Sequence, residues 1–368
     1  MTNLRLRPGL GDLPVFRSAP AGAGGIKLDS NELAFGPLPG VRDATADAVR
    51  EVNRYPDNSG ADLTRRLAET YGLPVETISL GPGSVGLCMQ LLQITCEAGD
   101  EVIIPWRSFE VYPTLARTAG AVVRAIPLTP AHKPDLVAMA AAITDRTRLV
   151  FVCTPNNPTG TVLGREELER FFDAVPGDVL VVLDEAYWEF VGDPDALDGI
   201  AYVKERIRRG RHNVVALRTF SKAYGLAGVR VGYCVSAEPV ADMLARVAVP
   251  YAVNTVAQRA AVASLACVSE LRTRVGVVAL ERERTREALV KWGYEVPPSG
   301  GNFLWLPLGE ASEPFRQHCL DRRIRVRALA GEGVRVTVGE PHENDELLAA
   351  ADTFPAGRAF NGKVSTSS

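Results

Sequence analysis

The 368-residue sequence has only four histidines and no Cys-x-x-Cys pair, so it lacks the ligand clusters typical of a structural zinc site. The histidines lie far apart along the chain, and the six cysteines are scattered. Several cysteines fall in apolar segments such as Phe151–Cys153 and Val231–Cys234. We therefore expect no metal site, and we predict that the cysteines are free, buried thiols.

The chain also lacks an excess of positive charge, a long apolar run and an apolar N-terminal signal. It has 41 Lys and Arg against 44 Asp and Glu, which disfavours nucleic acid as a partner. No apolar run is long enough to span a membrane, and Met1–Pro20 has no apolar core, so we expect a cytoplasmic protein with no membrane partner. The composition, 46% hydrophobic and 23% charged, is that of an ordinary enzyme, and the length allows two domains.

Short apolar runs alternate with amphipathic stretches in the middle of the chain, which predicts an α/β fold. Runs such as Leu180–Leu183 are apolar on both faces, as in a buried parallel strand. We expect a mostly parallel, seven-stranded sheet between helices, with ligands bound beyond the carboxyl ends of its strands. The expected strands are Thr77–Leu80, Glu101–Ile104, Val122–Ile126, Arg148–Cys153, Val179–Leu183, Asn213–Leu217 and Val229–Val235. The expected helices are Gly83–Cys96, Glu110–Ala119, Arg165–Ala174 and Ile200–Arg208.

The pattern changes after Ala237, where two long helical stretches precede short strands, and this predicts a smaller α+β domain. The N-terminal arm is rich in Gly and Pro and has no periodicity, so it should pack on the small domain or on a second subunit. The predicted organisation is an arm over residues 1–35, a large domain over 36–245, a small domain over 246–356 and a disordered tail over 357–368. The expected C-terminal helices are Thr255–Cys267, Ser269–Trp292, Glu313–Asp321 and Asn344–Ala351, and the strands are Phe303–Leu306, Ile324–Val326 and Val334–Val338.

One lysine, Lys222, stands among small and hydroxyl residues in Thr-Phe-Ser-Lys-Ala-Tyr-Gly, with Arg230 further along the same segment. A lysine in such a pocket loses hydration, so its amine can be neutral and nucleophilic near pH 7. Such an amine forms Schiff bases with aldehydes, and pyridoxal phosphate (PLP) is the common aldehyde cofactor. Ser221 and Arg230 could hold the cofactor's phosphate. The segment alone is equally compatible with a surface turn that carries a solvated lysine.

A glycine-rich turn, Gly81-Pro-Gly-Ser-Val-Gly86, follows the first expected strand and opens a helix. It matches the dinucleotide pattern G-x-G-x-x-G, but the acids Asp100 and Glu101 precede the next strand instead of closing it, which disfavours that site. The backbone NH groups of Gly83, Ser84 and Val85 could instead bind one phosphate at the helix N-terminus. A tight turn without a ligand would also need glycine.

Polar and aromatic side chains follow the other expected strands. Asn157 lies in a rigid Pro-Asn-Asn-Pro-Thr-Gly turn that points amides outward. Asp184 ends a buried strand, where a carboxylate needs a cation or caps the next helix, and Tyr187 would face the same way. Phe109 could stack on a flat ring or fill the core. Arg335 could bind a carboxylate or form a surface salt bridge.

Together and in this order, these motifs resemble the fold-type I PLP aminotransferases. More narrowly, they resemble the branch that contains histidinol-phosphate aminotransferase and its aromatic amino acid aminotransferase relatives. The resemblance runs from Lys27–Glu32 to Arg335–Gly339. Asn-Asn-Pro-Thr-Gly, Asp-Glu-Ala-Tyr and Ser-Lys-x-x-x-Leu-Ala-Gly-x-Arg are specific as a set. The resemblance implies a large PLP-binding domain and an obligate homodimer with shared active sites.

The resemblance also implies a role for each matching residue. Lys222 would hold PLP as a Schiff base and move the proton between substrate and cofactor, and Asp184 would pair with the protonated pyridine nitrogen. Arg335 matches the arginine that clamps the substrate carboxylate. The other implied contacts are Asn157 and Tyr187 to the ring's phenolic oxygen, Phe109 stacked on the ring, Ser84, Val85, Ser221 and Arg230 around the phosphate, and Tyr55 reaching the phosphate in the partner subunit.

Departures from the family pattern bear on the substrate. Histidinol-phosphate enzymes have an arm tyrosine that helps bind the substrate phosphate, and the nearest position here is Phe16, which has no hydroxyl. That loss favours an uncharged aromatic side chain, as do the Trp-Arg-Ser-Phe-Glu-Val-Tyr and Ala330–Arg335 segments. In contrast, Arg325 and Arg327 lie where a phosphate-binding arginine is expected, which favours a phosphorylated substrate.

The favoured prediction is therefore ping-pong amino transfer between an aromatic L-amino acid and 2-oxoglutarate. Histidinol-phosphate aminotransferase is the alternative. A PLP-dependent decarboxylase or lyase on the same scaffold is a further possibility, because the sequence does not show which Cα bond is broken. A non-catalytic domain that keeps this fold is disfavoured by the intact Lys222, Asp184 and Arg230.

Overall fold

The computed structural model describes residues 7, 9–15 and 25–355. The predictions for Phe16 and for the tail 357–368 lie outside the described residues. No helix in the described residues is long and apolar enough to cross a membrane. All six cysteines are free, and Cys88, Cys153, Cys234 and Cys319 are buried as predicted, whereas Cys96 and Cys267 are only partly buried.

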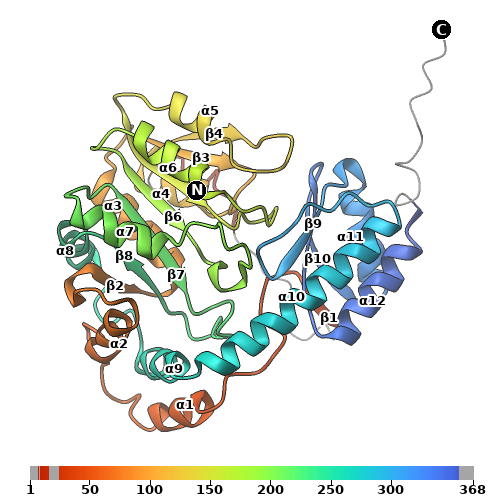
Figure 1. Cartoon of the computed structure of the whole chain (residues 1–368), viewed down its shortest axis with the longest axis horizontal. Coiled ribbons are helices and arrows are strands. Elements are labelled where there is room, and N and C mark those ends of the chain that lie inside the picture. Colours follow the sequence, from red (N-terminus) through yellow and green to blue (C-terminus); the bar gives the residue numbers. More distant parts are fainter. Residues whose placement is uncertain (1–6, 8, 16–24, 356–368) are drawn as a thin grey trace, which may run out of the picture.

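A seven-stranded sheet forms the centre of the larger lobe, in the order β2-β8-β7-β6-β5-β3-β4 (Figure 1). Neighbouring strands from β7 through to β4 pair in parallel, whereas β8 runs antiparallel to both of its neighbours. The predicted mostly parallel sheet is confirmed. Its strands are β2 (Ile78–Gly81), β3 (Glu101–Trp106), β4 (Val122–Pro127), β5 (Thr147–Cys153), β6 (Leu180–Asp184), β7 (Val214–Thr219) and β8 (Gly232–Val235).

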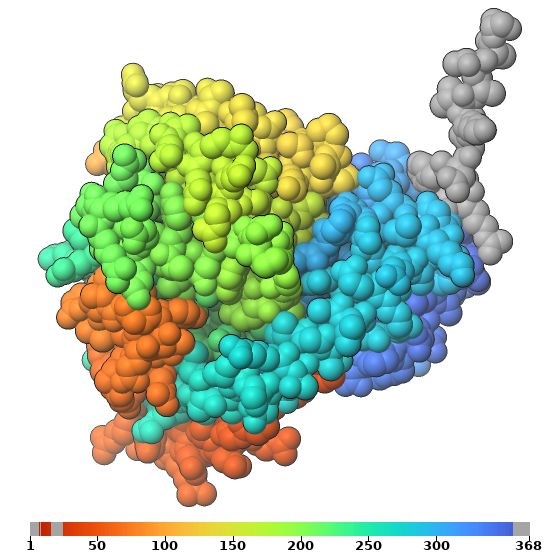
Figure 2. Space-filling model, viewed as in Figure 1, coloured from red at the N-terminus to blue at the C-terminus, as the bar shows by residue number. Residues whose placement is uncertain are grey.

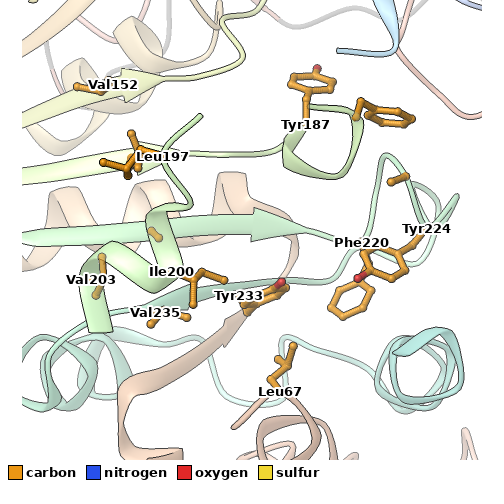
Figure 3. Close-up of a cluster of buried hydrophobic side chains, with 14 of the residues drawn as sticks. Leu67, Val152, Tyr187, Leu197, Ile200, Val203, Phe220, Tyr224, Tyr233 and Val235 are labelled. Carbon is orange, nitrogen blue, oxygen red and sulfur yellow. The ribbon is translucent and has the colours of Figure 1, made fainter. Parts of the chain in front are cut away.

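Both faces of this sheet are buried, as the apolar runs predict. Along β6, Val181 and Leu183 belong to one buried cluster, whereas Leu180 and Val182 belong to the other. Figure 3 shows part of the first cluster, which also contains Ile200 of the helix α7. The helices that follow the strands are α3 (Gly83–Thr95), α4 (Tyr112–Ala119), α5 (Leu136–Ala141), α6 (Arg165–Ala174), α7 (Gly199–Arg208) and α8 (Glu238–Val247), with short 3-10 turns at Val75–Thr77 and Trp188–Phe190.

The last strand of the large sheet is shorter than predicted. We expected a strand over Val229–Val235, but β8 begins at Gly232. Arg230 has a φ of 63°, which lies in the left-handed region and cannot continue a strand. The chain therefore turns at Arg230 before it enters the sheet.

A smaller sheet has the order β1-β10-β11-β9. Its edge strand β1 (Ile26–Leu28) comes from the arm and pairs in parallel with β10 (Ile324–Leu329), so the arm packs on the small domain, one of its two predicted locations. The other members, β11 (Gly333–Thr337) and β9 (Phe303–Leu306), pair in antiparallel fashion. The helices α11 (Ser312–Asp321) and α12 (Pro341–Asp352) accompany this sheet, with a 3-10 turn at Gly309–Ala311.

The long helix α10 (Val268–Lys291) connects the two lobes (Figure 1) and crosses the surface of the molecule in the view of Figure 2. The preceding helix α9 (Thr255–Leu265) packs against α1 (Val41–Val49) and α2 (Ala61–Tyr71). The predicted domain boundaries stay a prediction.

Candidate active site

The carboxyl ends of the parallel strands meet at one edge of the large sheet, and the predicted site residues gather there. The segments that follow β2, β3, β5 and β7 carry Ser84, Phe109, Asn157 and Lys222, respectively, and Asp184 is the last residue of β6. Residues spread over more than a hundred positions of sequence are therefore brought to one location by the parallel topology.

Lys222 is partly buried, and its Nζ donates to the backbone oxygens of Ser30 (3.3 Å) and Asn31 (3.2 Å). Burial, together with the positive charges of Arg335 and Arg230, lowers the pKa of the amine to about 7. A substantial fraction of the amine is therefore neutral at neutral pH, which is the state that attacks an aldehyde.

Asp184 is buried, with 3% of its surface exposed. One carboxylate oxygen accepts a hydrogen bond from the Tyr112 hydroxyl (2.6 Å), and the other accepts from the backbone NH of Ala186 (3.1 Å). Burial raises the pKa of Asp184, whereas these hydrogen bonds and the charge of Lys222 lower it. A buried carboxylate beside a lysine fits a protonated ring nitrogen, which would supply the compensating charge.

Arg230 and the N-terminus of α3 form an anion cradle. Gly83 has a φ of +75°, and a Cβ at this position would collide with the Arg230 guanidinium. Arg230 also donates to the Ser221 hydroxyl (3.2 Å), and Ser84 is buried next to Gly83 in the first turn of α3. A guanidinium, a hydroxyl and the free NH groups of a helix N-terminus suit a phosphate.

Arg335 reaches the same site from β11 of the small domain. It donates to the Asn157 side-chain oxygen (2.7 Å) and to the backbone oxygen of Asp29 (2.7 Å), and its Nε has no partner. Both acceptors are neutral, so the guanidinium charge is not neutralised by either of them. The group is suited to bind a carboxylate.

The hydroxyl group of Tyr187 can donate a hydrogen bond to a ligand in the site. Burial raises the pKa of Tyr187 to about 12, so the hydroxyl keeps its proton. Its oxygen accepts a hydrogen bond from the Asn31 amide (3.0 Å), which leaves the proton free for another acceptor. Asn31 itself is fully buried at a φ of 52° and is tied to Thr337 of β11.

Three contacts in this site could not be predicted from the sequence. Asn31 lies in the arm segment Lys27–Glu32, and Tyr112 and Glu110 lie in the Trp-Arg-Ser-Phe-Glu-Val-Tyr segment, but no local pattern identifies their partners. Tyr112 holds Asp184, and Glu110 forms an ion pair with Arg327.

The contacts of Phe109 and Tyr55 in this chain do not test the roles predicted for them. Phe109 is partly buried and packs edge-on against Tyr112, with ring centroids 5.4 Å apart. Tyr55 lies on the surface, 81% exposed, and stacks on Tyr251. The roles predicted for Phe109, Tyr55 and Arg327 stay predictions.

The described residues fit PLP. The cradle at Arg230 would hold the phosphate, Asp184 would face the ring nitrogen, and the Lys222 amine would meet the aldehyde. The Arg230 guanidinium, which lies against Gly83 at the start of α3 and donates to Ser221, and the buried charge of Asp184 are the observations on which this fit depends.

Comparison with known proteins identifies the family. The family model of aminotransferase class I and II matches residues 23–351. The chain is 53% identical to an aromatic amino acid aminotransferase of Rhodococcus jostii over 98% of this chain and 99% of that protein. It is 51% identical to one of Streptomyces avermitilis, over 96% and 98%.

Among solved structures, the chain resembles histidinol-phosphate aminotransferase from Sinorhizobium meliloti in complex with pyridoxal-5'-phosphate. The TM-score is 0.85 at 28% identity, covering 97% of this chain and 98% of that one. With the geometry above, these matches show that the chain belongs to the class I and II aminotransferases, which are PLP-dependent enzymes of fold type I.

Proposed function

We propose that this aminotransferase acts on aromatic L-amino acids, with 2-oxoglutarate as the acceptor in a ping-pong reaction. The observation that carries the amino-transfer part is the convergence of Lys222, Asp184 and Arg335 in one site. The aromatic substrate is supported by the names of the relatives at 53% and 51% identity.

Each residue has a task in this reaction. When bound, PLP supplies an aldehyde that takes up the amino group and a ring that withdraws electrons from the substrate Cα. The neutral Lys222 amine would attach the cofactor and then move the proton at Cα. Arg335 would orient the substrate carboxylate, and Asn157 and Tyr187 would hydrogen-bond the ring's phenolic oxygen.

A panel of amino donors with 2-oxoglutarate tests this function. We expect kcat/KM for phenylalanine and tyrosine to exceed that for histidinol phosphate by about tenfold or more, because histidinol phosphate has a larger phosphate ester in place of the carboxylate that Arg335 would bind. A preference for histidinol phosphate would support the alternative that the Sinorhizobium meliloti structure suggests. Release of carbon dioxide without amino transfer would contradict both and favour a lyase.

We further propose a homodimer with shared active sites, in which Tyr55 contacts the phosphate bound by the partner. Tyr55 is too exposed to serve a site in its own chain's interior. It belongs to an apolar surface patch that a second subunit could cover: Val49, Val52, Tyr55, Val249 and Tyr251 are all exposed, by 44% to 81%. Tyr55 and Tyr251 stack with centroids 4.5 Å apart, which ties the two parts of the patch together.

Tyr55→Phe should weaken PLP affinity about tenfold or more, because one hydrogen bond to a charged phosphate is lost. Mixed dimers test the sharing directly. When chains carrying Lys222→Ala are mixed with chains carrying Tyr55→Phe, each mixed dimer should regain one intact site and its wild-type PLP affinity. A mixture that binds PLP no better than the average of its parents would rule out shared sites.

A further inference from the structure

Arg327 and Arg335 are opposite each other in the small sheet. They are paired residues in the antiparallel register of β10 and β11, so their side chains project from the same face. The charge of Arg327 also helps burial to lower the pKa of Arg335, as expected for two neighbouring guanidinium groups. Left alone, such a pair would suit a ligand with two anionic groups.

Glu110 changes this arrangement. It comes from the loop after β3 in the large domain, and its carboxylate forms an ion pair with both Nη2 and Nε of Arg327. Glu110 acts on Arg335 only at longer range, where its charge partly offsets the lowering of the pKa. One arginine of the pair is thus neutralised, and the other keeps only neutral acceptors.

We propose that Glu110 is a specificity-determining residue, which leaves the site with one anion-binding guanidinium and so weakens the binding of substrates with an anionic side chain, 2-oxoglutarate and glutamate included, relative to substrates with an uncharged aromatic one. This inference rests on the proposed function, because it assumes that Arg335 binds the substrate carboxylate. A phosphate or carboxylate on the donor's side chain would find Arg327 occupied and would meet the negative charge of Glu110. An uncharged aromatic side chain meets neither cost.

The alternative explanation of the Glu110–Arg327 ion pair is purely structural: it could serve only to stabilise the contact between the two domains. The chain offers a matched control for this, since Arg107 and Glu332 form a second ion pair between the same two segments. Glu332 lies in the turn between β10 and β11 and is not the cross-strand neighbour of Arg335. Glu332→Gln therefore removes a domain contact of the same kind and leaves Arg327 neutralised.

The first test measures kcat/KM for phenylalanine, with 2-oxoglutarate as acceptor, and for glutamate, with phenylpyruvate as acceptor, in the wild type, Glu110→Gln and Glu332→Gln. In Glu110→Gln the ratio should shift toward glutamate by about tenfold or more, mainly through KM, because a freed guanidinium gains a charge-assisted hydrogen bond to the side-chain carboxylate. The KM for 2-oxoglutarate, which has a second carboxylate, should also fall. Glu332→Gln should leave the ratio within about twofold of the wild type. An unchanged ratio in Glu110→Gln, or an equal shift in Glu332→Gln, would overturn the proposal.

A second test is independent of turnover. Calorimetry with the PLP-loaded protein compares glutarate, which has two carboxylates, with 3-phenylpropionate, which has one. Glu110→Gln should bind glutarate about tenfold more tightly and 3-phenylpropionate about equally, and the double variant Glu110→Gln/Arg327→Gln should lose the gain. A gain that survives the loss of Arg327 would refute the role given to Glu110. A wild type that prefers histidinol phosphate would refute the proposed function instead. The glutarate binding data would still show whether Glu110 neutralises Arg327 in the site.

Discussion

Lys222→Ala is expected to abolish turnover, lowering kcat by about 10³-fold or more. The lysine is both the point of cofactor attachment and the group that moves the proton at Cα, and each role alone is worth orders of magnitude. Its amine is held by Ser30 and Asn31 close to Asp184. The checks are steady-state rates and the visible absorbance of the PLP-loaded protein.

The attachment itself can be located by borohydride reduction followed by peptide mass spectrometry. The cofactor mass should appear on Lys222 and vanish in Lys222→Ala, while Lys133→Ala, which removes a lysine paired with Glu167, serves as the control. Cofactor mass on another lysine, or full colour in Lys222→Ala, would contradict the assignment.

The pKa of Lys222 gives this capture a predictable pH dependence. Burial and neighbouring positive charge lower the pKa to about 7, so the neutral, reactive fraction grows as the pH rises through that value. Capture of PLP by the apoprotein should therefore speed up about tenfold between pH 6 and pH 8. A fully solvated lysine would stay protonated over this range and its neutral fraction would rise in proportion to hydroxide, without a plateau above pH 8.

The parts of the fold that sequence patterns predict well are those whose signal is local. The β6 strand is apolar at every position before Asp184, and α6 has an amphipathic pattern, so both were expected within a residue of their observed bounds. The arm strand β1 has three residues, and its pairing with Ile324–Val326 is a contact between opposite ends of the chain. A pattern read over a short window contains no information on that pairing.

The same distinction holds for the active site. Lys222, Asp184 and Asn157 were predicted because their motifs follow strands that end at one sheet edge. Asn31 and Glu110 act through partners more than a hundred residues away, Tyr187 and Arg327, and their own surroundings in sequence are ordinary. The spacing of motifs along the sequence predicts which residues follow a strand. The contacts that the small domain makes with that edge of the sheet depend on the tertiary fold, and no local pattern predicts them.

Asp184→Asn should have the second-largest effect, lowering the rate of amino transfer by about 10²- to 10⁴-fold, with cofactor affinity less affected. The amide has nearly the same shape and can still accept the Tyr112 hydrogen bond, but it has no charge to hold a proton on a ring nitrogen. Folding should survive, since burial already disfavours the carboxylate form, as its raised pKa indicates.

The measurement that isolates this effect is a single half-reaction, in which the PLP-loaded enzyme meets an amino donor without an acceptor and the loss of visible absorbance is followed. Tyr112→Phe is the matched control, because it removes the 2.6 Å hydrogen bond to Asp184 but keeps the negative charge. If the charge of Asp184 is what matters, Tyr112→Phe should lower the rate of the half-reaction by about tenfold or less, the effect of losing one hydrogen bond to a charged group. Asp184→Asn should lower that rate far more. Equal losses in the two variants would mean that Asp184 serves to position its neighbours, and a near-normal rate in Asp184→Asn would remove the charge pairing from the mechanism.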